Sequence, residues 1–212
     1  MTPTGECKRT SLTPEQRRQR QFLLSQLVYE MEDGRPVYYA GYREVLNGLR
    51  APEEIRGSSG LQSFLIETLQ DFLFTHELRQ RFRYLTNEVG VQIQKKKWRA
   101  CDIAIYEKVR LTNYVFDNKY MTVAPDYVIE IDTKADLSKY YYQHDYFIRK
   151  TRELHEFGVK KVIWIFTENR PSIWESESAD AIVIRDGWDH DVTITEGMTF
   201  NLATLFAKAQ KK

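Results

Sequence analysis

The sequence has 212 residues, of which 42% are hydrophobic, so it is long enough for one domain with a substantial core and is not that of a disordered chain. Its 31 Lys and Arg against 30 Asp and Glu leave a net charge of +1, which neither favours nor excludes nucleic acid, because a binding groove can be locally basic. No apolar run reaches the length of about 18 residues typical of a membrane span, and Cys7 and Cys101 indicate neither a disulfide framework nor a thiolate metal site, so we expect a cytoplasmic protein without membrane contact.

The chain is expected to form an N-terminal arm and helix over residues 1–30 and a single domain over residues 31–212. Thr13 is a candidate N-cap, and Pro14 suits the first helical position. These signals predict a helix from about Pro14 to about Leu27.

The next segment, MEDGRPVYYAGYREVLNG, indicates a strand, a turn at Asp33-Gly34 and a second element that ends near Gly48. A helix follows in SSGLQSFLIETLQDFLFTHEL, where Ser58 or Ser59 would cap the start. Its apolar residues recur at helical spacing: Leu61, Phe64, Leu65, Leu69, Phe72 and Leu73.

The hydrophobic period then changes to that of strands. YLTNEVGVQIQKKKWRACDIAIYEK alternates apolar and polar residues, which predicts two strands joined by a basic turn, and PDYVIEIDTK predicts a third. YYQHDYFIRKTRELHEFG predicts a helix that ends at Gly158, and VKKVIWIFTE a buried strand. The strand–helix–strand unit from Tyr127 to Phe166 favours a right-handed parallel crossover.

The last segments complete the expected fold. DAIVIRDGWD and DVTITEG are predicted to form a hairpin with Asp186-Gly187 in its turn, and TFNLATLFAKAQK an amphipathic helix. The fold class is therefore α/β or α+β, with a mixed central sheet flanked by helices.

Ionisable residues interrupt the apolar strand PDYVIEIDTK. Residues two apart on a strand share a face, so Glu130, Asp132 and Lys134 are expected on one side. Asp102 lies in the preceding strand, and adjacent strands are roughly 5 Å apart, so its carboxylate could meet that of Glu130 at one cation. Oxygen ligands of this kind suit Mg²⁺ or Mn²⁺, which bind through one or two carboxylates and substrate phosphate.

The segments RACDIAIYE, PDYVIEI and KTRELHEFGVKKVIWIF resemble the Uma-type family of restriction endonucleases, within the PD-(D/E)XK nuclease superfamily. The resemblance runs from EDGRPVYYAGYREVLNG to VIWIF and covers most of the chain. It implies a restriction-endonuclease-like core and a Mg²⁺- or Mn²⁺-dependent endonuclease that hydrolyses phosphodiester bonds in nucleic acid, with double-stranded DNA as the expected partner. Cutting both strands of a duplex would be simplest for a symmetric homodimer.

The resemblance also implies roles for particular residues. Asp102 and Glu130 would bind the metal together with the backbone carbonyl of Ile131, although this chain has RACD where the family often has Arg-Pro-Asp. The usual lysine of the superfamily, two residues after the glutamate, is replaced by Asp132. In the Uma-type pattern a lysine of the following helix takes over. Lys150 occupies that place and would orient the attacking water or stabilise the negative charge that builds on the phosphate. Lys134 is the rival lysine, but four residues past Glu130 it is expected to lie beyond the strand.

Two assignments stay open at this point. Asp132 would be either a third metal ligand or a partner of Lys150, and Glu67 matches the early helix acid that assists in the superfamily. QKKKWR offers a candidate nucleic-acid contact with an aromatic ring for stacking, although a solvated hairpin tip explains the same pattern. The residues of this contact are Lys95, Lys96, Lys97, Trp98 and Arg99.

Each carboxylate also has a structural explanation. Asp102 could cap a turn or pair with Arg99, and acids on an edge strand would deter aggregation. A catalytically inactive nuclease-like module that binds or regulates is the main alternative function. A domain in which arginine merely stabilises an acidic pair is the other.

Overall fold

The computed structural model describes residues 12–168 and 170–211, so the predicted arm before residue 12, with Cys7, lies outside the described residues. The helices of this part are α1 (Pro14–Gln26), α2 (Tyr42–Leu46), α3 (Glu53–Arg56), α4 (Gly60–Thr75), α5 (Gln143–Phe157) and α6 (Leu202–Ala209). The strands are β1 (Val28–Glu32), β2 (Arg35–Tyr38), β3 (Phe82–Gln94), β4 (Lys97–Glu107), β5 (Tyr127–Ile131), β6 (Lys161–Phe166), β7 (Ser172–Ser178), β8 (Ala181–Asp186), β9 (Asp191–Thr195) and β10 (Met198–Asn201). Short 3-10 helices cover Glu77–Gln80, Lys108–Leu111 and Leu137–Lys139.

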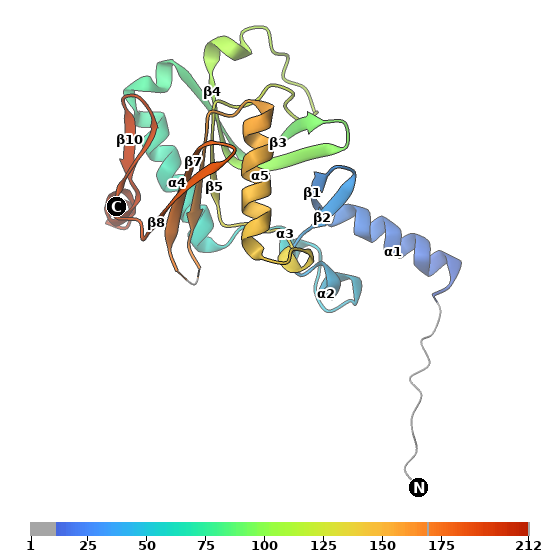
Figure 1. Ribbon diagram of the computed structural model, residues 1–212. Coiled ribbons are helices and arrows are strands. Elements are labelled where there is room, and N and C mark those ends of the chain that lie inside the picture. Colours follow the sequence, from blue (N-terminus) through green and yellow to red (C-terminus); the bar gives the residue numbers. More distant parts are fainter. Residues whose placement is uncertain (1–11, 169, 212) are drawn as a thin grey trace.

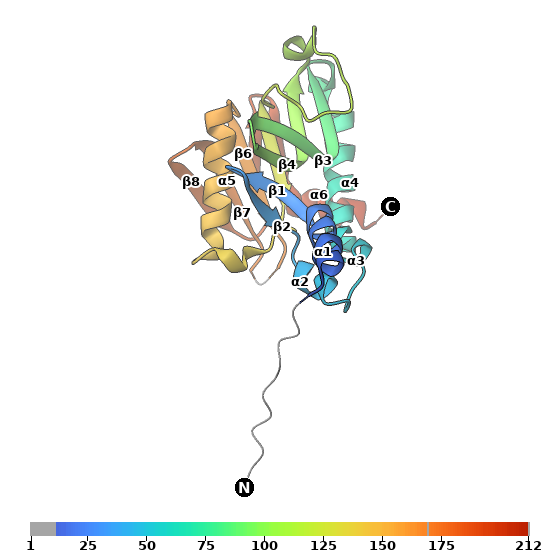
Figure 2. The same cartoon turned by 90° about the vertical axis from the view of Figure 1, so that its right-hand side faces the viewer.

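One large mixed sheet forms the centre of the molecule, with strand order β2-β1-β4-β5-β6-β7-β8 and β3 paired to β4. Strands β5 and β6 are parallel and joined through α5, whereas the other neighbouring pairs are antiparallel. Helix α5 covers one face of the sheet, and α4 and α6 lie on the opposite face (Figures 1 and 2). The predicted α/β class, mixed sheet and parallel crossover are confirmed.

The two faces of the sheet bury separate apolar clusters, because successive strand residues point to opposite sides. Beneath α5, Val128 and Trp164 pack with Leu154 of the helix, and on the other side Ile129 and Ile163 pack with the α4 residues. Every residue of β5 is buried, as expected for a strand with helices on both faces. Strand β5 is therefore central, which removes edge protection as the reason for its acidic residue.

The helix starts follow the sequence signals. Thr13 caps α1 and forms a capping box with Gln16, and the Ser59 hydroxyl accepts a hydrogen bond from the Gln62 N–H at the start of α4. Helix α1 has no buried residue and extends away from the sheet (Figure 1). In the described chain, no helix is long and apolar enough to cross a membrane.

The predicted hairpin around Asp186-Gly187 is wrong. Strand β8 pairs with β7, and β9 pairs with β10 in a second, two-stranded sheet. The reason is burial: Val192 and Ile194 of β9 join the apolar cluster on the α4 face. The chain must therefore leave the β8 edge after Asp186 and cross to that face.

Candidate active site

The structure brings Asp102 and Glu130 together on adjacent central strands. Ile103 of β4 pairs with Ile129 of β5, and one step further along this antiparallel register Asp102 lies opposite Glu130. Oδ2 of Asp102 accepts the backbone N–H of Ile131 at 2.8 Å. Two carboxylates and the end of β5 thus meet where the two strands separate.

Lys150 of α5 reaches the same point from above the sheet. Its Nζ lies 3.0 Å from Oε1 of Glu130 and 2.9 Å from Oε1 of Glu30, and it donates to the carbonyl of Ala100 at 2.7 Å. The side chain is 0% exposed. The ammonium, which has three N–H bonds, is thus surrounded by three oxygens, of which the Ala100 carbonyl accepts a hydrogen bond and the two carboxylates form ion pairs.

Glu30, a residue that the sequence did not single out, is the centre of this buried network. Its carboxylate lies 2.7 Å from Nη1 of Arg99 and accepts the Tyr146 hydroxyl at 2.8 Å. The usable signal was the segment YEME, which alternates acids in an apolar strand in the same way as VIEID. YEME lies at the start of a predicted strand close to the N-terminal arm, and nothing in the sequence indicated that this strand lies near VIEID in the fold.

Arg99 does not belong to an exposed basic turn. Its guanidinium is 0% exposed and forms ion pairs with Glu30, Glu32 and Glu153 at 2.7 to 2.9 Å. The predicted nucleic-acid contact by Arg99 is therefore corrected: burial with three acids makes it a structural cation. It does not pair with Asp102.

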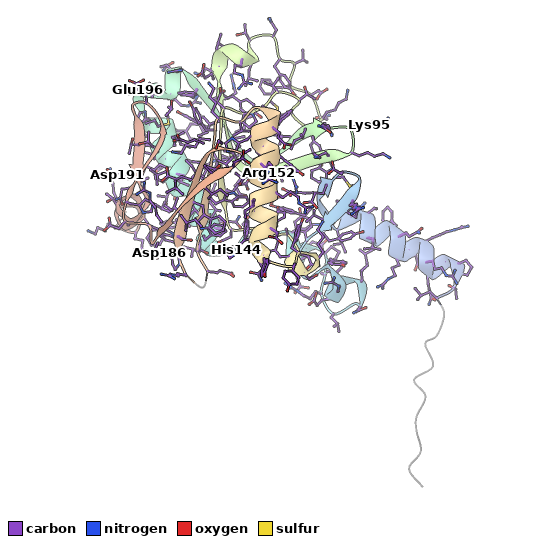
Figure 3. The ribbon with its side chains drawn as sticks, viewed as in Figure 1. Lys95, His144, Arg152, Asp186, Asp191 and Glu196 are labelled. Carbon is purple, nitrogen blue, oxygen red and sulfur yellow. The ribbon has the colours of Figure 1, made fainter. Side chains whose placement is uncertain are left out.

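The rest of the basic turn remains on the surface to different degrees. Lys95 and Lys96 are exposed, and Lys95 projects from the tip of the β3–β4 hairpin (Figure 3). Lys97 pairs with Asp33 at 2.9 Å, and the ring of Trp98 packs against Tyr120. Of the predicted contact residues, Lys95 and Lys96 thus have side chains exposed enough to bind the phosphates of a nucleic acid.

The charges of the site shift each other's proton affinity. Burial alone would raise the pKa of Glu30, but Lys150 and Arg99 outweigh it and hold that pKa below its usual value. Burial raises the pKa of Glu130 to about 8, with Asp102 and Glu30 adding to the effect against the attraction of Lys150. Burial also raises the pKa of Asp102. Glu130 is thus the carboxyl most in need of a further positive charge.

Gln62 of α4 joins the site from the other side. Its Nε2 donates to the carbonyl of Ile131 at 2.8 Å and lies 3.5 Å from Oδ2 of Asp102. Glu67, the predicted helix acid, is exposed, because five helical residues turn it by roughly 140° from Gln62. The helix residue beside the carboxylates is therefore the buried Gln62, which no residue pattern of the sequence had distinguished.

Asp132 has a local role and does not pair with Lys150, which contacts Glu30, Glu130 and the Ala100 carbonyl instead. Its φ of 54° is left-handed, and its Oδ1 and Oδ2 accept the N–H and the hydroxyl of Thr167 at 2.8 and 2.6 Å. The carboxylate therefore ties the end of β5 to the end of β6. Because the left-handed turn breaks the strand alternation, Glu130, Asp132 and Lys134 do not share one side as expected.

Lys134 lies instead in a cavity of about 420 Å³ beside Asp102. The cavity is lined by Arg56, Gly57, Ser58, Ser63, Ile66, Thr86, Asn87, Glu88, Asp102 and Lys134. Asp102 thus connects the buried network with a space that a ligand can enter.

Comparison with known proteins bears on the fold. No family model and no curated protein matches the chain. The crystal structure of a "putative nuclease belonging to DUF820" from Anabaena variabilis matches it with a TM-score of 0.60. The chain has a nuclease-like fold. The match covers 85% of this chain and 90% of the other at 16% sequence identity. At this identity the likeness is evidence of the fold alone.

Proposed function

We propose that this protein is a metal-dependent endonuclease that hydrolyses phosphodiester bonds in nucleic acid, with double-stranded DNA as its substrate. The observation that carries the proposal is the meeting of Asp102, Glu130 and the Ile131 carbonyl at the end of β5. The nuclease-like fold and the resemblance to the Uma-type family support it.

The donor set fits a hard divalent cation such as Mg²⁺ or Mn²⁺. No cluster of three His, Cys, Asp or Glu side chains that could hold a metal occurs in residues 12–168 and 170–211, so a cation would rest on two carboxylates and a carbonyl. Oε1 of Glu130 is buried and has an ion-pair contact with Lys150 but no hydrogen bond among the described groups. A cation would share this oxygen with the Lys150 ammonium.

Each residue of the site then has a distinct task. Asp102 and Glu130 would hold the cation, and the Gln62 amide would fix the Ile131 carbonyl. Lys150 would favour the ionised form of Glu130, because its buried ammonium contacts that carboxylate. When bound, the cation would polarise a phosphoryl oxygen and acidify a water molecule for attack.

The test is nicking of supercoiled plasmid with Mn²⁺, paired with calorimetric titration of Mn²⁺. Glu130→Ala and Asp102→Asn should abolish nicking and weaken Mn²⁺ binding, whereas Glu156→Gln, an exposed acid of α5, should change neither. Equal nicking by wild type and Glu130→Ala would refute the enzymatic function.

A binding module without catalysis is the second candidate. It is favoured by the Lys150–Glu130 contact, which occupies the carboxylate that a cation would need, and by Asp132 at the usual lysine position. In that case the wild type would bind a labelled duplex without nicking plasmid, and Asp102→Asn would bind it equally well. The expected homodimer is tested separately, by light scattering of the free and the duplex-bound protein.

A further inference from the structure

The cavity beside Asp102 contains a second lysine whose environment differs from that of Lys150. Lys134 Nζ donates to the carbonyl of Arg56 at 3.1 Å and pairs with Glu88, and its side chain is 13% exposed. Lys150 is fully enclosed and does not line this cavity. Of the two, Lys134 is the one that a bound ligand can contact.

The backbone fixes Lys134 at this place. The left-handed turn at Asp132 ends β5, and the next residues pair with the end of β2. The carbonyl of Lys134 accepts the N–H of Ala40 at 2.7 Å, and Ala135 forms a β-bridge with Tyr39. The lysine therefore stands on an anchored segment.

Glu88 reaches the cavity through a bulge in β3. The register with β4 shifts between Thr86 and Val89, and the two residues between them have left-handed φ values, 74° at Asn87 and 54° at Glu88. Left-handed backbone at non-glycine residues costs on the order of 1–3 kcal/mol each and gathers at functional sites. Bulges next to active sites commonly redirect a side chain, and this one places Glu88 against Lys134.

The remaining walls suit a phosphate group. Ser58 and Ser63 flank the first turn of α4 and offer hydroxyl donors, and Arg56 borders the same space. Asp102, a proposed metal ligand, closes one side. A phosphodiester that meets the cation at Asp102 would thus extend toward the ammonium of Lys134.

We propose that Lys134 is the catalytic amine of this site: it contacts the scissile phosphodiester of the nucleic acid and stabilises the negative charge that develops there. Glu88 is its positioning residue. This inference rests on the proposed function and transfers to Lys134 the catalytic role that the family resemblance implied for Lys150. Lys150 then acts on the reaction through Glu130.

The experiment compares Mn²⁺-dependent plasmid nicking, Mn²⁺ calorimetry and melting temperature across variants. Lys134→Met should lower the nicking rate about 100-fold, the scale for loss of one fixed donor at a developing charge. Mn²⁺ affinity should stay unchanged or rise, because the substitution removes the positive ammonium group of Lys134 from the neighbourhood of Asp102. Lys134→Arg should retain more activity than Lys134→Met, and Lys119→Met, a lysine with an 86% exposed side chain, should match wild type.

Glu88 is tested by a double-variant cycle. Glu88→Gln should slow nicking, and Glu88→Gln with Lys134→Met should be no slower than Lys134→Met, because a positioning residue has no effect once its lysine is absent. Additive losses would overturn the positioning role. If Lys134→Met melts at a lower temperature than wild type, Lys134→Gln, which keeps a donor, takes its place.

The outcomes separate the two proposals. Nicking by folded Lys134→Met or Lys134→Gln at the wild-type rate, with Asp102→Asn inactive, overturns the role of Lys134 and leaves the endonuclease proposal standing. Wild type no more active than Asp102→Asn overturns the endonuclease proposal and the role of Lys134 with it.

Discussion

Replacing Glu30 by glutamine keeps the shape of the side chain and removes a negative charge that lies between the buried cations of Lys150 and Arg99. Oε1 and Oε2 of Glu30 lie 2.9 Å from Nζ of Lys150 and 2.7 Å from Nη1 of Arg99. At an effective dielectric constant of about 20, each contact represents roughly 6 kcal/mol of attraction before desolvation. Desolvation offsets much of this, and breaking a buried ion pair through one partner typically costs about 3–5 kcal/mol.

We therefore expect Glu30→Gln to lower the free energy of unfolding by about 3–5 kcal/mol, which for a chain of this size corresponds to a melting temperature roughly 6–20 °C lower. Urea denaturation and thermal melting measure both quantities, with Glu156→Gln on the exposed face of α5 as a control that should stay within about 0.5 kcal/mol of wild type. In a Lys150→Met background the same substitution should cost less, because one of its cations is gone. A loss below about 1 kcal/mol in Glu30→Gln would refute the view that this charge stabilises the network.

Three further predictions concern proton binding, the end of β5 and the basic turn. Without metal, stability should fall by no more than about 5 kcal/mol as pH rises from 4.5 to about 8, because folded Glu130 keeps a proton that the unfolded chain releases. Urea titrations at several pH values should show this fall in wild type and a smaller one in Glu130→Gln, where Asp102, whose pKa burial also raises, still contributes. Asp132→Ala should lower stability by about 1–3 kcal/mol through the two lost Thr167 hydrogen bonds and leave Mn²⁺ affinity unchanged in calorimetry; a large loss of affinity would restore Asp132 as a ligand. Lys95→Gln with Lys96→Gln should weaken duplex binding and reduce its logarithmic salt slope by about two, as measured by fluorescence anisotropy, and an unchanged slope would show that the turn does not contact phosphates.

Local signals predicted most of the secondary structure. Thr13 and Ser59 cap the helices that their hydrogen-bonding side chains indicated, and Gly158 ends α5 with a left-handed φ of 116°. The order of strand, helix and strand also indicated the parallel crossover. The β8–β9 hairpin was mispredicted because the Asp186-Gly187 signal shows only that the chain can turn there. Whether β9 then pairs with β8 depends on where its apolar residues are buried, and they are buried in the cluster on the α4 face.

The site was predictable where it depends on neighbouring strands. Asp102 and Glu130 are acids in consecutive apolar strands, so their approach follows from strand pairing. Gln62 and Glu88 were missed because their roles depend on a helix face and on a bulge, and neither feature has a distinctive residue pattern. Glu67 was chosen in place of Gln62 because its charge suggested a ligand, although its side chain is exposed.

The sequence by itself determined where helices and strands form, and with them the mixed sheet and the pair of acids on its central strands, because hydrophobic period and capping act over a few residues. Only the tertiary structure decided which charges meet. Arg99 is buried against Glu30, Lys150 is surrounded by three oxygens, and Lys134 lines a cavity. The physical reason is that a buried charge must find its partners wherever the packed elements bring them, and residues 30, 99 and 150 meet only once β1, β4 and α5 have assembled.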